Sequence, residues 1–134
     1  MKSTRKWIAA IMAVLMLVLM AACGNGGNAA NENKAGYHTL EEIKAAGTIN
    51  IGVFSDKNPF GYVDENGEYQ GYDVYFARRL AEDLGVKVNF ISTEAANRIE
   101  YLKTGKVDVI LANFTVTPAR AEEVDFALPY MNVA

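Results

Sequence analysis

Hydrophobic and polar positions repeat with two different periods along this chain, and each period predicts a different kind of element. Residues 48–53 and 86–91 alternate apolar and polar side chains, which is the pattern of a half-buried strand. Residues 107–112 are almost all apolar, as in a strand that is covered on both faces. An Asn-Gly pair at 66–67, between two short apolar runs, predicts a small hairpin over residues 60–70.

Three other stretches carry apolar residues three and four positions apart, which predicts helices over residues 40–46, 74–84 and 95–104. A capping box precedes the first helix, and Asp73 is expected to cap the second. A glycine follows each pattern and indicates where the helix ends. Strands separated by helices of this length predict an α/β fold with a parallel sheet.

The first 22 residues do not share these periods. Lys2, Arg5 and Lys6 precede the apolar run 7–22, which is shorter than the ~20 residues of a membrane-spanning helix and ends in small residues directly before Cys23. A charged start, a short apolar run and small residues at its end are typical of a secretory signal. The alternative is an uncleaved anchor with an incidental cysteine. Both interpretations place the remaining chain outside the cytoplasm.

The chain is therefore expected to have three parts: a signal peptide at 1–22, a flexible tether at 23–37 and a folded lobe at 38–134. The tether is rich in Gly, Asn and Ala and has almost nothing to bury. His38, at its end, is expected to be solvated and without a role. Because the sequence stops at Ala134 just as a new apolar segment begins, we expect it to be part of a longer protein.

Composition narrows the possible functions. The chain has 13 basic and 16 acidic residues, and loss of residues 1–22 removes three basic and no acidic residues, which changes the formal charge from −3 to −6. This charge argues against a nucleic-acid partner. One Cys and one His exclude a disulfide framework and a Cys/His zinc site. Without a Ser/His pair or a phosphate-binding glycine loop, we expect neither enzymatic activity nor a cofactor or metal.

Candidate chemistry gathers after the third predicted strand. In open α/β sheets, ligands bind beyond the carboxyl ends of the strands, where the loops at 54–60, 92–97 and 113–119 are expected to meet. Thr117 and Pro118 are suited to begin a helix, whose free N–H groups favour an anion. These features predict an anion site in this loop region.

Arg120 is the main candidate for binding that anion. In the first turn of the helix, its guanidinium can hold a carboxylate through two hydrogen bonds, and the Thr115 hydroxyl is a further donor. The alternative is a surface ion pair between Arg120 and Glu123 or Asp125.

Several motifs together resemble one family. Residues 38–134 resemble the extracytoplasmic solute-binding proteins of polar amino-acid ABC importers (family 3). The motifs that carry this resemblance are 71–84, Val107-Asp108, 115–122, 124–126 and Pro129-Tyr130. The segments 54–57, 94–98 and 111–115 look most similar to the cysteine-binding lipoprotein branch. The resemblance implies the parallel-sheet lobe of a two-lobed, type II periplasmic-binding-protein fold, with the second lobe absent from this chain. A single lobe is expected to bind poorly by itself.

The resemblance also implies roles for individual residues. Arg120 and Thr115 would hold the α-carboxylate of a free amino acid, and the backbone carbonyl of Asn113 would receive its ammonium group. Asp56 lies in the first ligand loop, where the family often has an acidic side chain. Phe54 would form the pocket wall.

Two further expectations concern the side chain of the ligand. Arg98 either enters the pocket or pairs with Glu94 one helical turn away, and the salt bridge is the favoured interpretation. Lys57 and Asn58 stand where many members have an aromatic residue that stacks on the ligand. A small polar ligand, cysteine in particular, is therefore expected.

In functional terms, the resemblance implies the binding component of an ABC importer, which delivers its amino acid to the transmembrane permease subunits. The segment before Cys23 looks like a lipoprotein signal, with Met20 where the pattern usually has Leu, so a lipidated, palmitate-carrying Cys23 would anchor the protein to the membrane. The alternatives are a periplasmic enzyme on the same fold, such as a dehydratase or the N-terminal module of a lytic transglycosylase, and the ligand-sensing ectodomain of a receptor.

Overall fold

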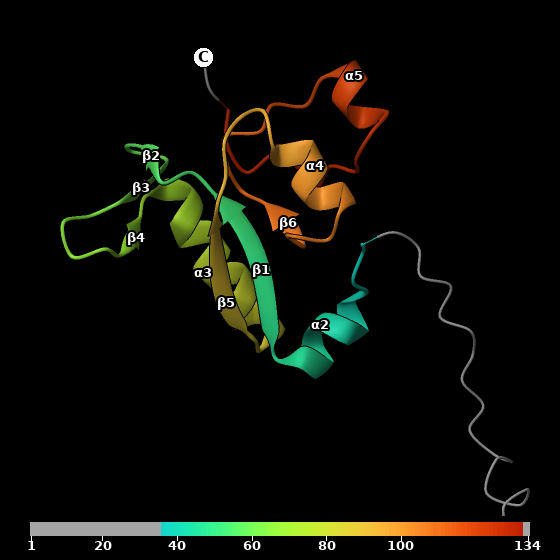
Figure 1. Ribbon diagram of the computed structural model, residues 1–134, viewed down its shortest axis with the longest axis horizontal. Helices are drawn as coiled ribbons and strands as arrows, with labels where there is room; N and C mark the ends of the chain where they lie inside the picture. The colour runs from blue at the N-terminus through green and yellow to red at the C-terminus, as the bar shows by residue number, and fades with distance from the viewer. Residues whose placement is uncertain (1–35, 133–134) are drawn as a thin grey trace, which may run out of the picture. The chain divides into compact units, whose positions relative to one another are not determined.

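The computed structural model describes residues 36–132, so the predicted signal, most of the tether and Cys23 lie outside the described residues. Figure 1 shows the elements in chain order: α2 (Leu40–Ala46), β1 (Thr48–Val53), β2 (Asp56–Lys57), β3 (Gly61–Val63), β4 (Tyr69–Gln70), α3 (Tyr72–Leu84), β5 (Lys87–Ser92), α4 (Arg98–Lys103), β6 (Val109–Ile110) and α5 (Pro118–Ala121). Across these residues, every helix is too short or too polar to cross a membrane.

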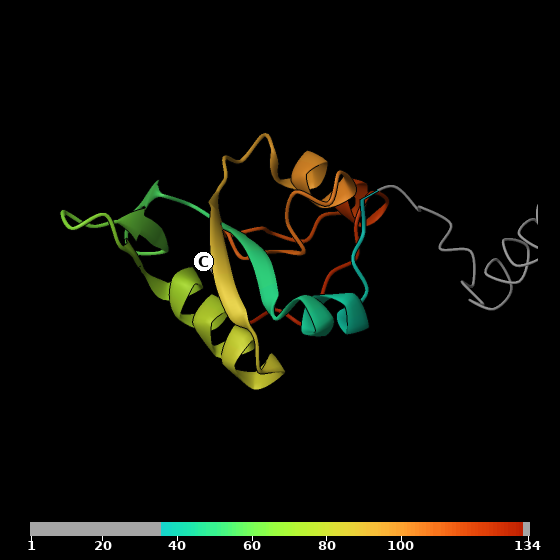
Figure 2. The ribbon, with the colours of Figure 1, turned by 60° about the horizontal axis from the view of Figure 1, so that its bottom comes forward.

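The central strand of the larger sheet is β1, in the order β5-β1-β6, and all three strands are parallel. β1 pairs with β5 along its whole length and with β6 through Ile51 and Gly52. The chain passes from β1 to β5 through α3, and then back past β1 to β6 through α4. Because these two connections run in opposite directions along the sheet, right-handed crossovers place α3 and α4 on opposite faces. Figures 1 and 2 show α3 and α4 on the two sides. The predicted α/β fold is confirmed.

The hydrophobic core lies between β1 and α3. Ile49, Ile51 and Val53 are at most 1% exposed and face the helix residues Val74 and Ala77. Each fully buried aliphatic side chain of this kind contributes about 1.5–3 kcal/mol. The apolar side chains predicted from the alternation of β1 and from the helical period of α3 therefore pack against one another in one layer.

A second, antiparallel sheet has the order β2-β3-β4. The predicted hairpin is confirmed: β3 and β4 pair around a turn in which the Asp64 carboxylate accepts hydrogen bonds from the amides of Asn66 and Glu68. Part of the segment predicted to be a loop after β1 forms the short strand β2, which pairs with β3. This extra pairing fixes the loop that follows the carboxyl end of β1.

The start of α3 differs from the prediction. The helix begins at Tyr72 with Gly71 as its N-cap residue, so Asp73 is not the cap. The amides of Tyr72 and Asp73 instead donate to the carbonyls of Pro59 and Phe60, at 2.9 and 2.8 Å. The backbone of the β2–β3 connection therefore replaces a side-chain cap. Asp73 turns inward and is fully buried.

The helix α4 and the edge strand β6 are both shorter than predicted. α4 covers Arg98–Lys103 rather than residues 95–104, and β6 covers Val109–Ile110 rather than residues 107–112. The backbone of β6 is bonded to β1 on one side, and its residues are only half-buried. The prediction of a strand covered on both faces is therefore wrong for the described part of the chain.

His38 is also placed differently from the prediction. Its Nδ1 lies 2.7 Å from Oδ1 of Asp108, whose other oxygen accepts from the Asn50 amide at 2.7 Å. The Asp108 side chain is only 3% exposed, so this contact attaches the start of the folded lobe to the sheet. The His38 side chain stays half exposed, as expected, but its contact with Asp108 was not predicted.

We predict that Gly71→Ala lowers the free energy of unfolding by about 2–5 kcal/mol, through left-handed backbone strain and overpacking together. Gly71 has a φ of 120°, and a Cβ there would lie 2.4 Å from the carbonyl oxygen of Phe60. Chemical denaturation measures the change.

Gly85→Ala is the matched control. Gly85 has a φ of 71°, and a Cβ there would meet open space, so this variant is expected to lose only about 1–2 kcal/mol. Equal losses in the two variants would show that the contact with Phe60 does not restrict this position.

Candidate functional site

Parallel strands place their carboxyl ends at one edge of the sheet, and the candidate residues come from the loops that leave this edge (Figure 1). Phe54 follows β1, Arg98 begins α4 after β5, and Phe114 follows β6. Arg98 lies 5.7 Å from the Phe54 ring centroid and 4.4 Å from that of Phe114, measured from Cζ. The predicted meeting of the three loops is therefore seen in these contacts.

Arg98 is buried, with 5% exposure. Its Nη1 donates to the carbonyls of Ala112 and Asn113 at 2.8 and 3.2 Å, and its Nε donates to the carbonyl of Ala95 at 3.2 Å. The favoured ion pair with Glu94 is therefore wrong: backbone carbonyls fix the guanidinium, and Glu94 is exposed.

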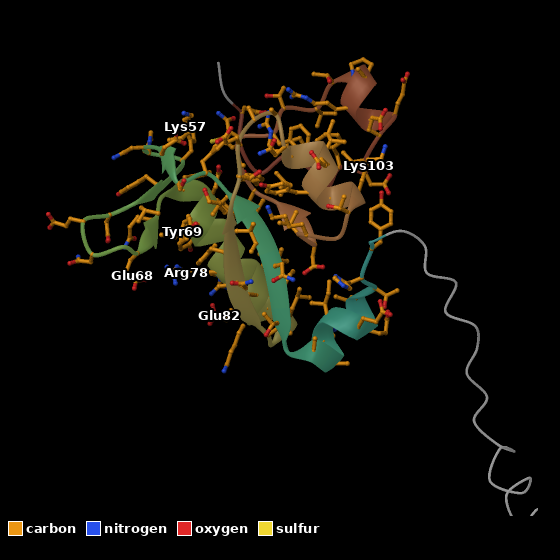
Figure 3. The ribbon with its side chains drawn as sticks, in the orientation of Figure 1. Lys57, Glu68, Tyr69, Arg78, Glu82 and Lys103 are labelled. Carbon is orange, nitrogen blue, oxygen red and sulfur yellow. The ribbon has the colours of Figure 1, made fainter. Side chains whose placement is uncertain are left out.

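Arg120 approaches the same aromatic ring. Its Cζ lies 4.9 Å from the Phe114 ring centroid, and its Nη1 donates to the carbonyl of Thr115 at 2.7 Å. The alternative of a surface ion pair is wrong, because Glu123 pairs with Lys103 at 2.6 Å and Asp125 forms no ion pair among the described residues. Figure 3 labels Lys103 in α4.

The two guanidinium groups share a region without a neutralising carboxylate. Among residues 36–132, neither Arg98 nor Arg120 forms a salt bridge. Burial lowers the pKa of Arg98 below the ordinary arginine value, and the positive charge of Arg120 lowers it further. Two unpaired cations near a half-buried ring make this region favourable for an anion.

The start of α5 contributes less than predicted. Thr117 is its N-cap and Pro118 its first residue, as expected. However, the Arg120 amide donates to the Thr117 side chain and carbonyl, at 3.3 and 3.1 Å. The Arg120 amide is therefore not one of the free N–H groups that were expected at the start of this helix.

Thr115 and Asn113 lie in the predicted loop. Thr115 is exposed, and its hydroxyl makes no hydrogen bond within the described part of the chain. The Asn113 carbonyl, which was expected to receive an ammonium group, accepts a hydrogen bond from Arg98. A cation at this oxygen opposes the arrival of a second one, since like charges repel.

Asp56 and Phe54 occupy different environments. Asp56 is exposed and pairs with the adjacent Lys57 at 2.7 Å. The structure does not bring its carboxylate into contact with either arginine of the site. Phe54 is 6% exposed and forms part of the wall beneath Arg98.

Sequence reasoning missed the role of Asp73. Its Oδ2 accepts from the Asn113 amide at 3.1 Å, and its Oδ1 accepts from the Tyr130 hydroxyl at 2.8 Å. Burial raises the pKa of Asp73, while its two hydrogen bonds act in the opposite direction. Asn113 has a φ of 47°, so the carboxylate fixes a left-handed turn at the entrance of the loop. The available signal in the sequence was an acidic residue, Asp73, next to the apolar residues that form the buried face of α3.

An apolar cavity of about 530 Å³ adjoins this region, beside β6 and the segment that follows α5. Asn113, Phe114 and Thr115 are among its lining residues, whereas Arg98 and Arg120 are not. Within residues 36–132, no cluster of His, Cys, Asp and Glu has an arrangement suited to a metal ion. The guanidinium pair is therefore the candidate site.

Comparison with known proteins gives a consistent picture. Residues 49–134 match the family described as bacterial extracellular solute-binding proteins, family 3. The glutamine-binding protein of Geobacillus stearothermophilus is 33% identical over 137 residues, which cover 92% of this chain and 52% of the relative. The chain thus spans about half the length of the curated relatives it matches.

Two solved structures share the fold. A solute receptor for L-cysteine from Neisseria gonorrhoeae is 64% identical with a TM-score of 0.69, over 70% of this chain and 39% of that one. A point mutant of domain 1 of an arginine-binding protein from T. maritima, in its arginine-bound form, is 38% identical with a TM-score of 0.67, over 69% of this chain and 72% of that one. The similarity therefore lies in one lobe of a type II binding-protein fold.

One similar protein is an enzyme. Cyclohexadienyl dehydratase from Pseudomonas aeruginosa is 30% identical over 92 residues, which cover 69% of this chain and 34% of the relative. Most of the similar proteins bind amino acids. The fold alone therefore does not separate binding from catalysis.

We predict that Asp73→Asn gains stability relative to the parent as the pH rises above about 3.8, the ordinary pKa of an aspartate. The raised pKa means that the folded protein holds the proton more tightly than the unfolded chain. The contribution of Asp73 is thus fully present below the unfolded pKa and is lost as the pH rises through the folded pKa. The expected slope is at most about 1.4 kcal/mol per pH unit.

Denaturant unfolding of both proteins between about pH 3.5 and 7 measures this difference. Asp83→Asn, on the exposed side of α3, controls for the change in net charge. A stability difference that does not vary with pH would contradict the effect of burial on Asp73.

Proposed function

Because this chain belongs to the bacterial extracellular solute-binding proteins of family 3, we propose that it captures a small polar amino acid, cysteine by preference, for an ABC importer. The observation that carries the proposal is the pair of guanidinium groups on Phe114, which lack a carboxylate partner in the described lobe. The carboxylate of a free amino acid supplies the missing negative charge.

Arg120 is the residue proposed to bind that carboxylate. Nη1 is engaged by the Thr115 carbonyl, whereas the remaining N–H groups of the guanidinium have no acceptor among the described residues. A planar fork with free donors matches a carboxylate through two parallel hydrogen bonds. The exposed Thr115 hydroxyl is close in sequence and is available as a third donor.

The preference for a small ligand has two supports. Lys57 and Asn58 occupy the loop position at which many members of the family have an aromatic residue that stacks on the ligand, and both are exposed. The L-cysteine receptor of Neisseria gonorrhoeae is 64% identical in the matched lobe. Together they favour cysteine over arginine or glutamine as the ligand.

We further propose the arrangement of the whole protein. Residues 1–22 would direct export, Cys23 would carry the lipid, and the tether would hold the lobe at 38–134 above the membrane. A second lobe would close on the ligand, and permease subunits would receive it. The length of the curated relatives supports a second lobe, because this chain spans about half of it.

Dehydration chemistry is the second candidate, because one relative is a cyclohexadienyl dehydratase. Such an enzyme needs a general acid in the cleft, and a carboxyl group with a free oxygen is one residue type that can act as one. The buried carboxyl group nearest to the loop, Asp73, has both oxygens engaged, by the Asn113 amide and the Tyr130 hydroxyl. This arrangement favours binding without turnover.

We predict that Arg120→Ala weakens binding of the preferred amino acid by about 2–5 kcal/mol, the cost of truncating one side of a buried charge pair. Isothermal titration calorimetry of the full-length mature protein, with the second lobe proposed above, measures the effect with L-cysteine, L-cystine, L-glutamine and L-arginine. A single lobe is expected to bind too poorly for this measurement.

Arg79→Ala is the control, since Arg79 is an exposed arginine that pairs with Glu82 and Asp83 on α3. It is expected to leave the affinity unchanged. Unaltered affinity in Arg120→Ala would remove the proposed role of Arg120, and binding of none of the four amino acids would contradict the proposed ligand class.

A separate prediction concerns the anchor. Cells that express this chain with its leader should incorporate labelled palmitate into the protein, and Cys23→Ser should abolish the label, because Cys23 is the only thiol in the sequence. Asn28→Ala, in the same predicted tether, should retain it. Labelling of the Cys23→Ser protein would contradict lipidation at this position.

A further inference from the structure

The burial of Arg98 is unusual for a charged side chain without an acidic partner. Lys and Arg are almost never fully buried unless they are paired. Arg98 is 5% exposed, and its three hydrogen bonds go to backbone carbonyls. These carbonyls belong to Ala95, before α4, and to Ala112 and Asn113, after β6. One guanidinium therefore connects two loops at the carboxyl edge of the sheet.

The same guanidinium fixes the Phe114 ring. Arg98 lies over the ring at 4.4 Å, and Arg120 lies 4.9 Å from the ring centroid. Phe126 packs against the ring as well, with 5.2 Å between centroids and an interplanar angle of 55°. Phe114 is thus held from several directions, and Arg120 contacts a surface whose position is set by Arg98.

A purely structural role does not account for the charge. Burial of a cation costs free energy, and the nearby Arg120 adds like-charge repulsion. An uncharged amide side chain would donate to some of the same carbonyls without either cost. Fixed positive groups in a region poor in water are, however, favourable for binding an anion, because they need no rearrangement when it arrives.

We propose that Arg98 is a positioning residue, which clamps Phe114 and thereby presets the Arg120 guanidinium for the carboxylate of the amino acid. This inference rests on the proposed function. Arg98 acts through the ring, and Arg120 makes the contact with the ligand. The clamp therefore determines how well the site distinguishes an acid from its neutral amide.

The test compares the affinity for an amino acid with the affinity for its primary amide, which lacks the negative charge. The probe is whichever of L-cysteine, L-cystine, L-glutamine and L-arginine binds most tightly, together with its amide, and calorimetry gives both dissociation constants. Arg98→Met is expected to lower the acid-to-amide preference by about tenfold or more, since a misplaced binding group loses most of its contribution.

Phe114→Leu separates positioning from direct contact. It keeps the charge of Arg98 and removes the ring between the two guanidinium groups, so it should lower the preference to a similar extent. Arg98→Lys should not restore the preference, because an ammonium group cannot bond three carbonyls in the geometry of a planar fork. If Arg98→Met fails to fold, Phe114→Leu decides the question.

Arg78→Met is the matched control. Arg78 also lies over a phenylalanine ring, that of Phe90 at 5.1 Å, and its Nη2 donates to the carbonyl of Tyr69 at 3.1 Å. Figure 3 shows Arg78 and Tyr69 beside each other, near β4 and α3. The control should keep the full acid-to-amide preference.

The outcomes separate the two proposals. A parent protein that binds acid and amide equally well would overturn the proposed role of Arg120, and the clamp with it. A parent with a clear preference that survives in Phe114→Leu would overturn the clamp alone. Loss of preference in Arg98→Met and Phe114→Leu, with Arg78→Met unchanged, supports it.

Discussion

Two positive charges on one phenyl ring are the constraint on which the candidate site depends. Arg98 and Arg120 approach the ring of Phe114, and no carboxylate of the described lobe neutralises them. Backbone carbonyls offset part of the cost, because four hydrogen bonds from the two guanidinium groups end on carbonyl oxygens. The peptide groups of two loops thus hold the charges where an anion can reach them.

The sequence was most informative where one local signal decided the structure. The capping box and the terminal glycine defined α2 to the residue, because both signals act within a few positions of the chain. The alternation of β1 and the helical period of α3 were equally reliable, since both follow from burial against a single partner layer. Local chemistry was sufficient for these elements.

Prediction from the sequence failed where contacts between distant segments determine the structure. The Pro59 and Phe60 carbonyls replace the expected cap of α3, and this pairing is visible only once the hairpin has folded back on the helix. Arg98 illustrates the same limit within the site. Its spacing to Glu94 suggested an ion pair, whereas its guanidinium donates to the carbonyls of Ala95, Ala112 and Asn113. Two of these carbonyls lie beyond β6 and come close only in the folded chain. Arg120 lies beside Phe114 in the predicted loop region, but its hydrogen-bond partner was not predicted.

Asp73 has a mechanical consequence. A single buried carboxylate receives the amide of Asn113 on one oxygen and the hydroxyl of Tyr130 on the other. These groups belong to segments that are separated by α5 and would otherwise fluctuate separately. Because both groups bind the same carboxylate of α3, thermal displacements of the Asn113 turn and of the chain around Tyr130 become correlated. A shift of one segment then distorts the hydrogen bond of the other.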